Sequence, residues 1–282
     1  MEKITISTDS TSDLSKDLIE KNNITIAPLH VLLGENDHKD GIDIMPEDIF
    51  NYVKENNELP KTSACSVAEY IEIFTKLLND NDYVIHFTIS SKCSSTYNNA
   101  VLAANEFDGK VKIIDSLHLS TGQGLLVLKA CDMVKEGKSF NEIVSNVEEL
   151  KNKVQTSFVV DTVDYLYKGG RCTAAARIAS KILNIHPSIT MKNGTLGVKK
   201  NYHGNLKKSL EGYSHDLALE YKSYDKKRVF ITHSCCSDEI VNSVIDIVKK
   251  EFNFEEIIVT VAGSVVTSHC GQGTLGILFI TE

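Results

Sequence analysis

Short apolar runs alternate with longer amphipathic segments along the first half of the chain. The runs have the length and the β-branched composition of strands, whereas the longer segments repeat their apolar positions every three to four residues, as helices do. This alternation predicts a mostly parallel sheet with helices on both faces. The predicted strands are Lys3–Thr8, Ile24–Leu33, Tyr83–Ile89 and Val111–Asp115. The predicted helices are Leu14–Asn22, Pro46–Asn56, Val67–Asn79, Thr96–Phe107, Ser116–Glu136 and Phe140–Lys153.

Three of these helices carry a start signal. Asp13 precedes the first as a candidate N-cap, and Pro46 stands at the first helical position of the second. A proline is tolerated there because the N–H that it lacks would have no partner inside the helix. Ser66 and Glu69 have the spacing of a capping box at the start of the third.

A second α/β unit is predicted to begin near residue 156. Asn193-Gly194 between two short apolar runs is a hairpin signal, so this unit is expected to contain a mixed sheet. We therefore expect two α/β domains, residues 1–155 and 156–282. The strands predicted for the second unit are Thr156–Asp161, Ser188–Met191, Leu196–Lys199, Arg228–His233, Glu256–Val261 and Leu275–Thr281. The helices predicted for it are a short one ending at Lys168, Thr173–Leu183, Leu206–Tyr221 and Asp238–Phe252.

Composition and charge narrow the class of protein. Hydrophobic residues make up 42% and charged residues 24% of the 282 residues, as in ordinary globular proteins. The net charge of -8 argues against non-specific nucleic-acid binding, which needs a basic surface.

The N-terminus has no signal-peptide pattern, and no apolar run approaches the ~20 residues of a membrane helix. Seven cysteines without C-x-x-C spacing predict free thiols. We expect a cytoplasmic protein with at most transient membrane contact and no nucleic-acid partner.

Three loops rich in hydroxyl groups carry the candidate chemistry: Lys61–Ser63, Ser90–Tyr97 and Ser268–Gly273. The first two precede predicted helices, where free backbone amides and the helix dipole favour an anion. The second loop holds four serines and a threonine, which suits a carboxylate or a phosphate. The hydroxyls of the first loop are a weaker signal, because such residues commonly only cap a helix. The candidate ligands in these two loops are Thr62, Ser63, Ser94, Ser95 and Thr96.

Further candidates lie outside these two loops. Asp9 and Ser10 follow the first strand, and ligands of open α/β sheets bind beyond the carboxyl ends of strands. A plain turn that caps the next helix explains the same two residues equally well. Arg171 follows two glycines and is able to clamp an anion with two N–H groups. His269 lies beside the Gly271 turn, although a lone histidine is more often structural than catalytic.

Several familiar motifs are excluded or weak. Gly271, Gly273 and Gly276 have the spacing of a dinucleotide fingerprint, but a strand rather than a helix follows them. There is no Walker A pattern, so we expect no ATP site and no cofactor. The absence of G-x-S-x-G weakens an α/β-hydrolase interpretation. Cys93 and Cys270 fall inside the second and third hydroxyl loops and Cys65 lies just after the first, which leaves a metal or redox site open as a minor alternative. Small buried hydrophobes are the favoured interpretation of these cysteines, and no metal is expected.

In their order and spacing these motifs resemble the DegV family, whose members include the fatty-acid-binding subunits of bacterial fatty acid kinase. The resemblance covers essentially the whole chain. The matching stretches are Thr8–Leu14, Lys61–Ser63, Ile89–Lys92, Ser94 with Thr96-Tyr97, Asp115-Ser116, Gly122-x-Gly124, Tyr165–Arg171, and His269 with Gly271 and Gly273. The chain departs from the usual family pattern at several positions. Cys65 or Gln272 stands in place of a proline, and Ser95 stands in place of a glycine. Cys270 stands in place of a threonine, and His203 in place of an arginine.

The resemblance implies two α/β domains with a fatty-acid tunnel between them. It implies that Ser94 and Thr62 hold the carboxylate of a long-chain fatty acid, with His269 close by. It also implies that the bound acid is presented to a separate ATP-binding kinase subunit, which forms an acyl phosphate. In that hypothesis His269 and Arg171 support the phosphoryl-transfer state.

Two alternatives stay open at this point. One is a binder of another anionic small molecule with no kinase partner. The other is an esterase that uses Ser94 and His269, for which no third member of a triad is identifiable.

Overall fold

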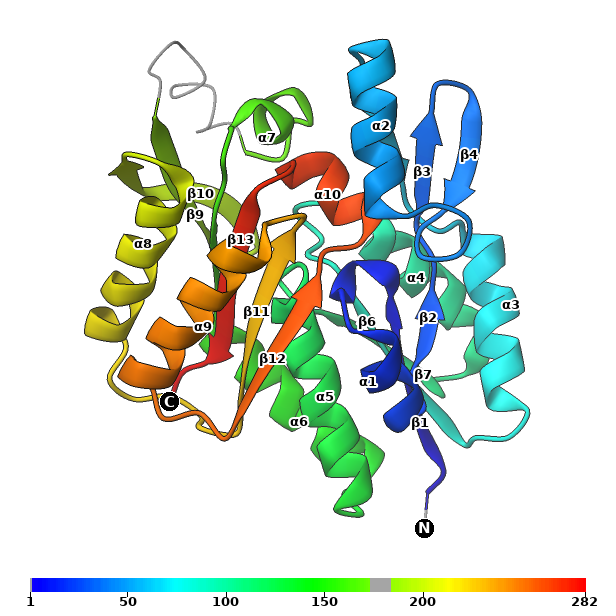
Figure 1. Cartoon of the computed structure of the whole chain (residues 1–282). Coiled ribbons are helices and arrows are strands. Elements are labelled where there is room, and N and C mark those ends of the chain that lie inside the picture. Colours follow the sequence, from blue (N-terminus) through cyan, green and yellow to red (C-terminus); the bar gives the residue numbers. More distant parts are fainter. Residues whose placement is uncertain (1, 173–183) are drawn as a thin grey trace.

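The computed structural model describes residues 2–172 and 184–282 and contains a parallel sheet and a mixed sheet on either side of a central helix (Figure 1). The predicted α/β class is therefore confirmed. The helix predicted at residues 173–183 lies outside the described residues. Among those residues, every helix is too short or too polar to cross a bilayer.

The parallel sheet has the strand order β2-β1-β6-β7, and all of its pairs are parallel. Its strands are β1 (Ile4–Asp9), β2 (Thr25–Ala27), β6 (Tyr83–Thr88) and β7 (Val111–Asp115). Alternation of side chains sends Ile85 and Phe87 to one face and Val84 to the other. The first face is covered by α5 (Thr121–Lys135) and α6 (Phe140–Leu150), and the second by α3 (Val67–Leu78) and α4 (Thr96–Ala104).

The strand predicted at residues 24–33 is wrong as a single element. It breaks at Pro28-Leu29, and its second part turns away to form β3 in a separate antiparallel sheet. Proline has no N–H to donate to a ladder, so a break at this position is physically reasonable. The small sheet consists of β3 (His30–Leu33), β4 (Asn36–Lys39) and β5 (Lys61–Ser63). The predicted loop at residues 61–63 is therefore a strand, held by its pairing with β3.

Two of the three start signals are confirmed. Pro46 occupies the first turn of α2 (Pro46–Asn56), and Ser66 and Glu69 form the capping box of α3. Asp13 is not the N-cap of α1 (Lys16–Lys21), because Ser15 accepts the capping hydrogen bond. Asp13 instead takes a left-handed backbone conformation and is buried.

The mixed sheet has the order β10-β9-β8-β13-β11-β12, with one parallel pair between β11 and β12. Its strands are β8 (Val154–Val159), β9 (Ile185–Lys192), β10 (Thr195–His203), β11 (Arg228–Ser234), β12 (Glu256–Val261) and β13 (Thr274–Ile280). The outer face is covered by α8 (Leu206–Glu220) and α9 (Asp238–Glu251). The hairpin between β9 and β10 turns at Asn193 and Gly194, both with positive φ, as the sequence predicts.

Two short helices, α7 (Asp164–Lys168) and α10 (Ser264–Cys270), lie at the upper end of the mixed sheet (Figure 1). The sequence pattern does not predict α10. It has seven residues, and Val265, Val266 and Thr267 are β-branched, which disfavours an isolated helix. Packing against α2, α7, β3 and β5 stabilises it instead.

Helix α5 is buried on nearly all sides because it packs against both sheets. Its core cluster includes Phe87 of the parallel sheet and Phe230 and Leu278 of the mixed sheet. Two glycines allow this close approach. A Cβ atom at Gly122 would overlap Thr156 Oγ1 of β8, and one at Gly124 would lie 2.9 Å from the Ser12 carbonyl oxygen. The division into domains at residue 155 stays a prediction, because α5 belongs to the core of both sheets.

The two glycines generate a prediction about stability. Gly122→Ala and Gly124→Ala should each lower the free energy of unfolding by about 1–3 kcal/mol, because the added methyl group overpacks a closed interface. Urea unfolding followed by circular dichroism would measure this change.

Gly212→Ala on α8 is the matched control. Its Cβ atom would lie 3.4 Å from the Tyr202 ring, which is ordinary contact. Alanine is the better helix former, so this variant should be unchanged or stabilised by up to about 1 kcal/mol. A gain in stability for all three variants would contradict the close-approach explanation.

Candidate ligand-binding site

A cavity of about 270 Å³ lies between the two sheets, with walls from both halves of the chain. Most of its lining is apolar. The apolar side chains include Leu29, Ile89, Leu119, Phe158, Leu166, Leu196, Val265, Val266 and Leu278. Six of the predicted site residues also line it, from four separate segments of the chain: Thr62, Ser63, Ser94, Ser95, Arg171 and His269.

Thr62 and His269 meet directly, although they are 207 positions apart. Thr62 lies on β5 and His269 in the last turn of α10, and these two elements pack against each other. The distance from Thr62 Oγ1 to His269 Nε2 is 2.8 Å, which is a hydrogen bond. The pairing therefore depends on a strand and a helix that the sequence does not predict.

His269 is neutral at ordinary pH. Burial, together with the nearby Arg171 guanidinium, lowers the pKa of its imidazole to about 3. The Nδ1 atom is buried and has no hydrogen-bond partner among the described residues. It faces the backbone of Gly169, where a Cβ atom would lie 2.6 Å from Nδ1. The first glycine of the Gly169-Gly170 motif thus makes room for the imidazole.

Ser94 lies on the loop between β6 and α4. Its Oγ atom is 2.7 Å from Thr96 Oγ1 and accepts the backbone N–H of Thr96 at 3.2 Å. When the Thr96 hydroxyl donates to it as well, the Ser94 hydroxyl proton is free to point into the cavity. Thr96 itself is buried and does not line the cavity, so its role is to support Ser94.

The Ser94 loop is held in place from the other half of the molecule. Ser90 donates its hydroxyl to the carbonyl oxygen of Gly194 at 2.7 Å, and Gly194 is the turn of the β9–β10 hairpin. A Cβ atom at Gly194 would lie 2.7 Å from Ser90 Oγ. The Asn-Gly turn therefore serves both the hairpin and this docking contact.

Arg171 lies at the mouth of the cavity. It is exposed, and its Nη1 atom donates to the Gly169 carbonyl oxygen at 2.6 Å. The same arginine, with Thr62 and His269, also lines an outer cleft of about 700 Å³ between the end of α2 and α7. Lys61 and Lys168 border this cleft together with Glu58 and Asp164, so with Arg171 the basic side chains there outnumber the acidic ones by one.

Asp9 and Ser10, predicted to face a ligand, lie behind the cavity wall instead. Asp9 is fully buried and accepts hydrogen bonds from Thr11, Gln123 and the amide of Ile89. Burial raises the pKa of Asp9 to about 6. Ser10 accepts the N–H of Leu29 at 3.1 Å. The turn alternative is thus closer to the structure, because these side chains form hydrogen bonds within the protein and do not line the cavity.

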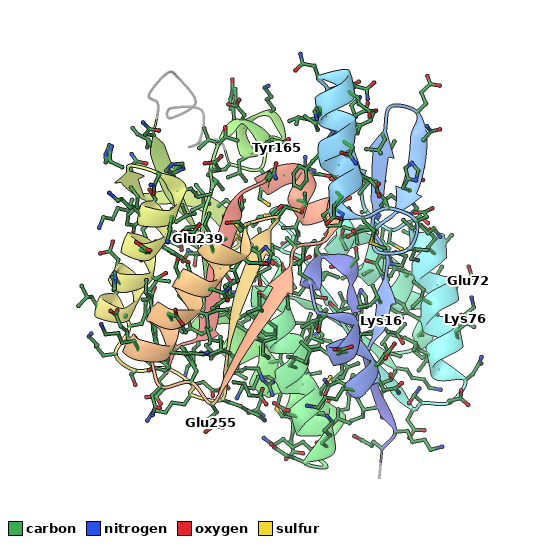
Figure 2. All side chains as sticks on the ribbon, viewed as in Figure 1. Lys16, Glu72, Lys76, Tyr165, Glu239 and Glu255 are labelled. Carbon is green, nitrogen blue, oxygen red and sulfur yellow. The ribbon has the colours of Figure 1, made fainter. Side chains whose placement is uncertain are left out.

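Gly271 also lies outside the cavity lining. It ends α10 with a φ of 77°, a conformation that favours glycine. The ring of Tyr165 occupies the position where a side chain would be, with Cδ2 2.7 Å from an ideal Cβ atom. Tyr165 therefore closes over the end of α10 from α7 (Figure 2).

Several polar lining residues were not predicted. Ser120, Thr232, His233, Ser234 and Thr274 line a further part of the wall. Thr232, His233 and Ser234 are the last residues of β11, and polar residues at the end of a strand are a usable signal for a site. Thr232 Oγ1 lies 2.6 Å from Thr121 Oγ1 and 2.9 Å from Thr260 Oγ1.

Of the three cysteines in or just after the hydroxyl loops, Cys93 and Cys270 line the cavity, and Cys65 does not. Burial raises the pKa of the Cys93 thiol to about 11 and that of Cys270 to about 12. Both are therefore thiols rather than reactive thiolates at neutral pH. Within residues 2–172 and 184–282, no group of three histidine, cysteine or acidic side chains is arranged to hold a metal ion.

Comparison with known proteins places these features in a family. The sequence profile of the DegV family matches residues 3–282. A DegV domain-containing protein of Caldanaerobacter subterraneus subsp. tengcongensis is 35% identical over 282 residues, with 99% of both chains covered. The structure of a DegV family protein from Thermus thermophilus, which binds fatty acid, has a TM-score of 0.93 at 31% identity and covers 99% of this chain and 100% of that one. A DegV lipid-binding protein from Thermotoga maritima has a TM-score of 0.88 at 30% identity, with 99% of both chains covered.

The burial of His269 generates a prediction about its titration. Because the pKa of this base is lowered in the folded protein, its contribution to stability is full above the ordinary value of 6.5 and is lost as the pH falls toward 3. The His269 ring-proton signal, assigned with His269→Gln, should therefore show no titration midpoint between about pH 7 and 4 in nuclear magnetic resonance spectra. A midpoint near 6.5 would show that the imidazole is solvated.

Proposed function

We propose that this chain, which belongs to the DegV family, binds a long-chain fatty acid in the cavity between its two sheets. The observation that carries the proposal is the composition of the wall. A mostly apolar enclosure ends at hydroxyl groups of Thr62 and Ser94, backed by a neutral imidazole. The fatty-acid-binding relative from Thermus thermophilus and the lipid-binding relative from Thermotoga maritima support it.

The apolar wall supplies most of the binding free energy. Leucine, valine and phenylalanine side chains from both halves of the chain line it. Burial of an acyl chain gains about 0.8 kcal/mol per CH₂ group, so sixteen carbons contribute on the order of 10 kcal/mol. A small hydrophilic anion would gain none of this, so the lining favours an acyl chain over the alternative anionic ligands.

The carboxylate needs hydrogen-bond donors to offset its desolvation. When His269 Nε2 carries the ring proton, it donates to Thr62 Oγ1, and the Thr62 hydroxyl then donates to the carboxylate. Ser94 has the same arrangement, because its oxygen accepts from Thr96 and its proton is free. Each hydroxyl donor to a charged acceptor contributes roughly 1.5–3 kcal/mol. The two groups therefore hold the head group without placing a buried positive charge beside it.

We infer further that the carboxylate is presented to a separate ATP-binding kinase subunit that forms an acyl phosphate. Thr62, His269 and Arg171 line both the cavity and the outer cleft, so a carboxylate bound between them would lie next to the outer surface. Arg171, Lys61 and Lys168 would add positive potential where phosphate charge has to approach. The absence of a Walker A pattern in the chain agrees with a carrier role.

The esterase alternative has less support from the geometry. The hydrogen-bond partner of the Ser94 hydroxyl is Thr96, and that of His269 Nε2 is Thr62. A serine nucleophile needs the imidazole as its base, and the imidazole needs a third group that orients its other nitrogen. His269 Nδ1 has no such partner among the described residues.

The proposal predicts one fatty acid for each chain. Native mass spectrometry of the protein offered palmitate or oleate should show one bound molecule, and denaturing extraction should recover it. Thr62→Ala and Ser94→Ala should each weaken binding by about 10- to 100-fold, because each removes one charge-assisted hydrogen bond.

The matched control is the double variant Thr75→Ala with Ser145→Ala, which removes two exposed hydroxyl groups on α3 and α6. It should bind as the unaltered protein does. A protein that stays empty with both acids would contradict fatty-acid binding. Unchanged affinity in the double variant of Thr62 and Ser94 would contradict the head-group assignment alone.

The carrier role predicts a division between binding and phosphorylation. With oleate, ATP and an ATP-binding fatty acid kinase subunit, the protein should yield an acyl phosphate that hydroxylamine traps as a hydroxamate. Arg171→Ala should lower the rate by about 100-fold, because a charge near the transferred phosphoryl group is lost. Its effect on oleate affinity should be much smaller, because the exposed guanidinium lies at the mouth.

Lys16→Ala, a change at an exposed residue of α1, is the control. No hydroxamate from any combination, or equal losses in rate and affinity, would contradict this role.

A further inference from the structure

Two buried carboxylates hold the beginning of α10. Asp13 Oδ1 accepts the N–H of Gly263 at 2.9 Å, and Asp40 Oδ1 accepts the N–H of Ser264 at 2.8 Å. Asp13 follows the first strand of the parallel sheet, and Asp40 follows β4. The first turn of α10 is thus attached to the N-terminal half of the chain, although its sequence neighbours belong to the mixed sheet.

Asp13 connects three parts of the molecule. The backbone of Asp13 is left-handed, with a φ of 50°. The residue is only 6% exposed, so its carboxylate is buried. Its Oδ2 atom accepts the hydroxyl of Ser120, the residue before α5. One side chain therefore joins the turn after β1, the start of α5 and the start of α10.

The two carboxylates close on Gly263 from two directions. A Cβ atom at Gly263 would lie 3.2 Å from Asp13 Oδ1 and 3.2 Å from Asp40 Oδ2. Asp40 Oδ2 is buried and has no hydrogen-bond partner among residues 2–172 and 184–282. Two like charges that converge on one point in a buried site repel each other, and one proton on the pair removes the repulsion.

We propose that Asp13 shares a proton with Asp40 and that both are positioning residues, which fix α10 and thereby hold His269 against Thr62. The other end of the same seven-residue helix carries His269, whose partner Thr62 also belongs to the N-terminal half. Both ends of α10 are therefore tied to that half. Loosening the first end changes the alignment of the second.

Burial and the neighbouring acidic groups favour a proton on Asp13, whereas its hydrogen bonds from Ser120 and Gly263 oppose it. Burial raises the pKa of Asp40 as well. The ionisable groups that act on Asp13 are Asp9 of β1, Asp40 and Cys270 of α10, each of which would be negative if charged. The start of α5 contributes only the neutral Ser120 hydroxyl. Burial, with smaller contributions from Asp40 and Asp9, raises the pKa of Asp13 to about 8.

The first test needs no ligand, so its failure is distinct from failure of the proposed fatty-acid binding. Carbon-13 spectra of the aspartate carboxyl groups should contain one signal with a midpoint near pH 8, which disappears in Asp13→Asn. Asp40→Asn should shift that midpoint downward, because it removes the neighbouring charge. A spectrum without any aspartate signal that titrates near pH 8 would overturn the proposal, and this measurement on the unaltered protein requires no variant to fold.

The second test measures whether ionisation of Asp13 changes the environment of His269. As Asp13 ionises near pH 8, the His269 ring signals should move, although the imidazole itself stays neutral. In Asp13→Asn these signals should not change over the same range. Asp246→Asn, the same change at an exposed residue of α9, should behave as the unaltered protein does. His269 signals that do not move near pH 8, or that move equally in Asp13→Asn, would show that the carboxyl pair does not position α10.

The sign of the stability effect provides a third readout. In the unfolded chain Asp13 loses its proton above the ordinary aspartate pKa of 3.8, whereas in the folded protein the raised pKa keeps the proton bound up to about pH 8. Stability should therefore fall as the pH rises from about 4 to 8 and become constant above that range. Asp13→Asn should remove this component, and the same slope in Asp13→Asn and in the unaltered protein would contradict the proton on Asp13.

Discussion

Burial of α5 between two sheets is the constraint on which the rest of the structure depends. A helix with core contacts on nearly all sides has no solvent face, so its side chains have to satisfy both sheets at once. Gly122 faces β8 and Gly124 faces the turn after β1, and neither position has room for a methyl group. The distance between the two sheets is thereby set at the start of α5, close to the cavity that they enclose.

Buried hydrogen bonds between polar side chains then fix the orientation of the N-terminal half of the chain relative to the mixed sheet. Gln123 of α5 donates to Thr8 and Asp9 at the end of β1, and Ser120 donates to Asp13. Thr121 meets Thr232 of the mixed sheet. A buried polar group that loses its hydrogen-bond partner destabilises the fold by about 1–3 kcal/mol, so each of these hydrogen bonds opposes a displacement of one half relative to the other. The cavity wall is preorganised as a consequence, which reduces the entropy lost on binding.

The chemistry of the site follows from how charge is distributed around it. The interior contains hydroxyl groups and an imidazole that burial keeps neutral, whereas Arg171 and two lysines lie at the mouth and in the outer cleft. Neutral donors stabilise a bound carboxylate without a buried counter-charge of their own to desolvate. The cations outside remain available to an incoming anionic group. Binding and presentation of a carboxylate therefore depend on different residues.

Local patterns along the chain were sufficient for the α/β class, for the capping box at Ser66 and for the hairpin at Gly194, and they singled out Thr62, Ser94 and His269, which the structure brings to one cavity. Each of these depends on short-range periodicity, turn chemistry or motif spacing. Other features were beyond such patterns. The strand nature of β5 and the helix α10 depend on packing partners far along the chain, and so does the bond between Thr62 and His269. Asp9 was predicted to face a ligand or to form a turn, and Asp13 to cap a helix, because nothing local reveals that α5 and α10 bury them. Burial and long-range pairing are properties of the assembled chain, so only the tertiary structure decided which polar residues line the cavity and which ones hold its walls.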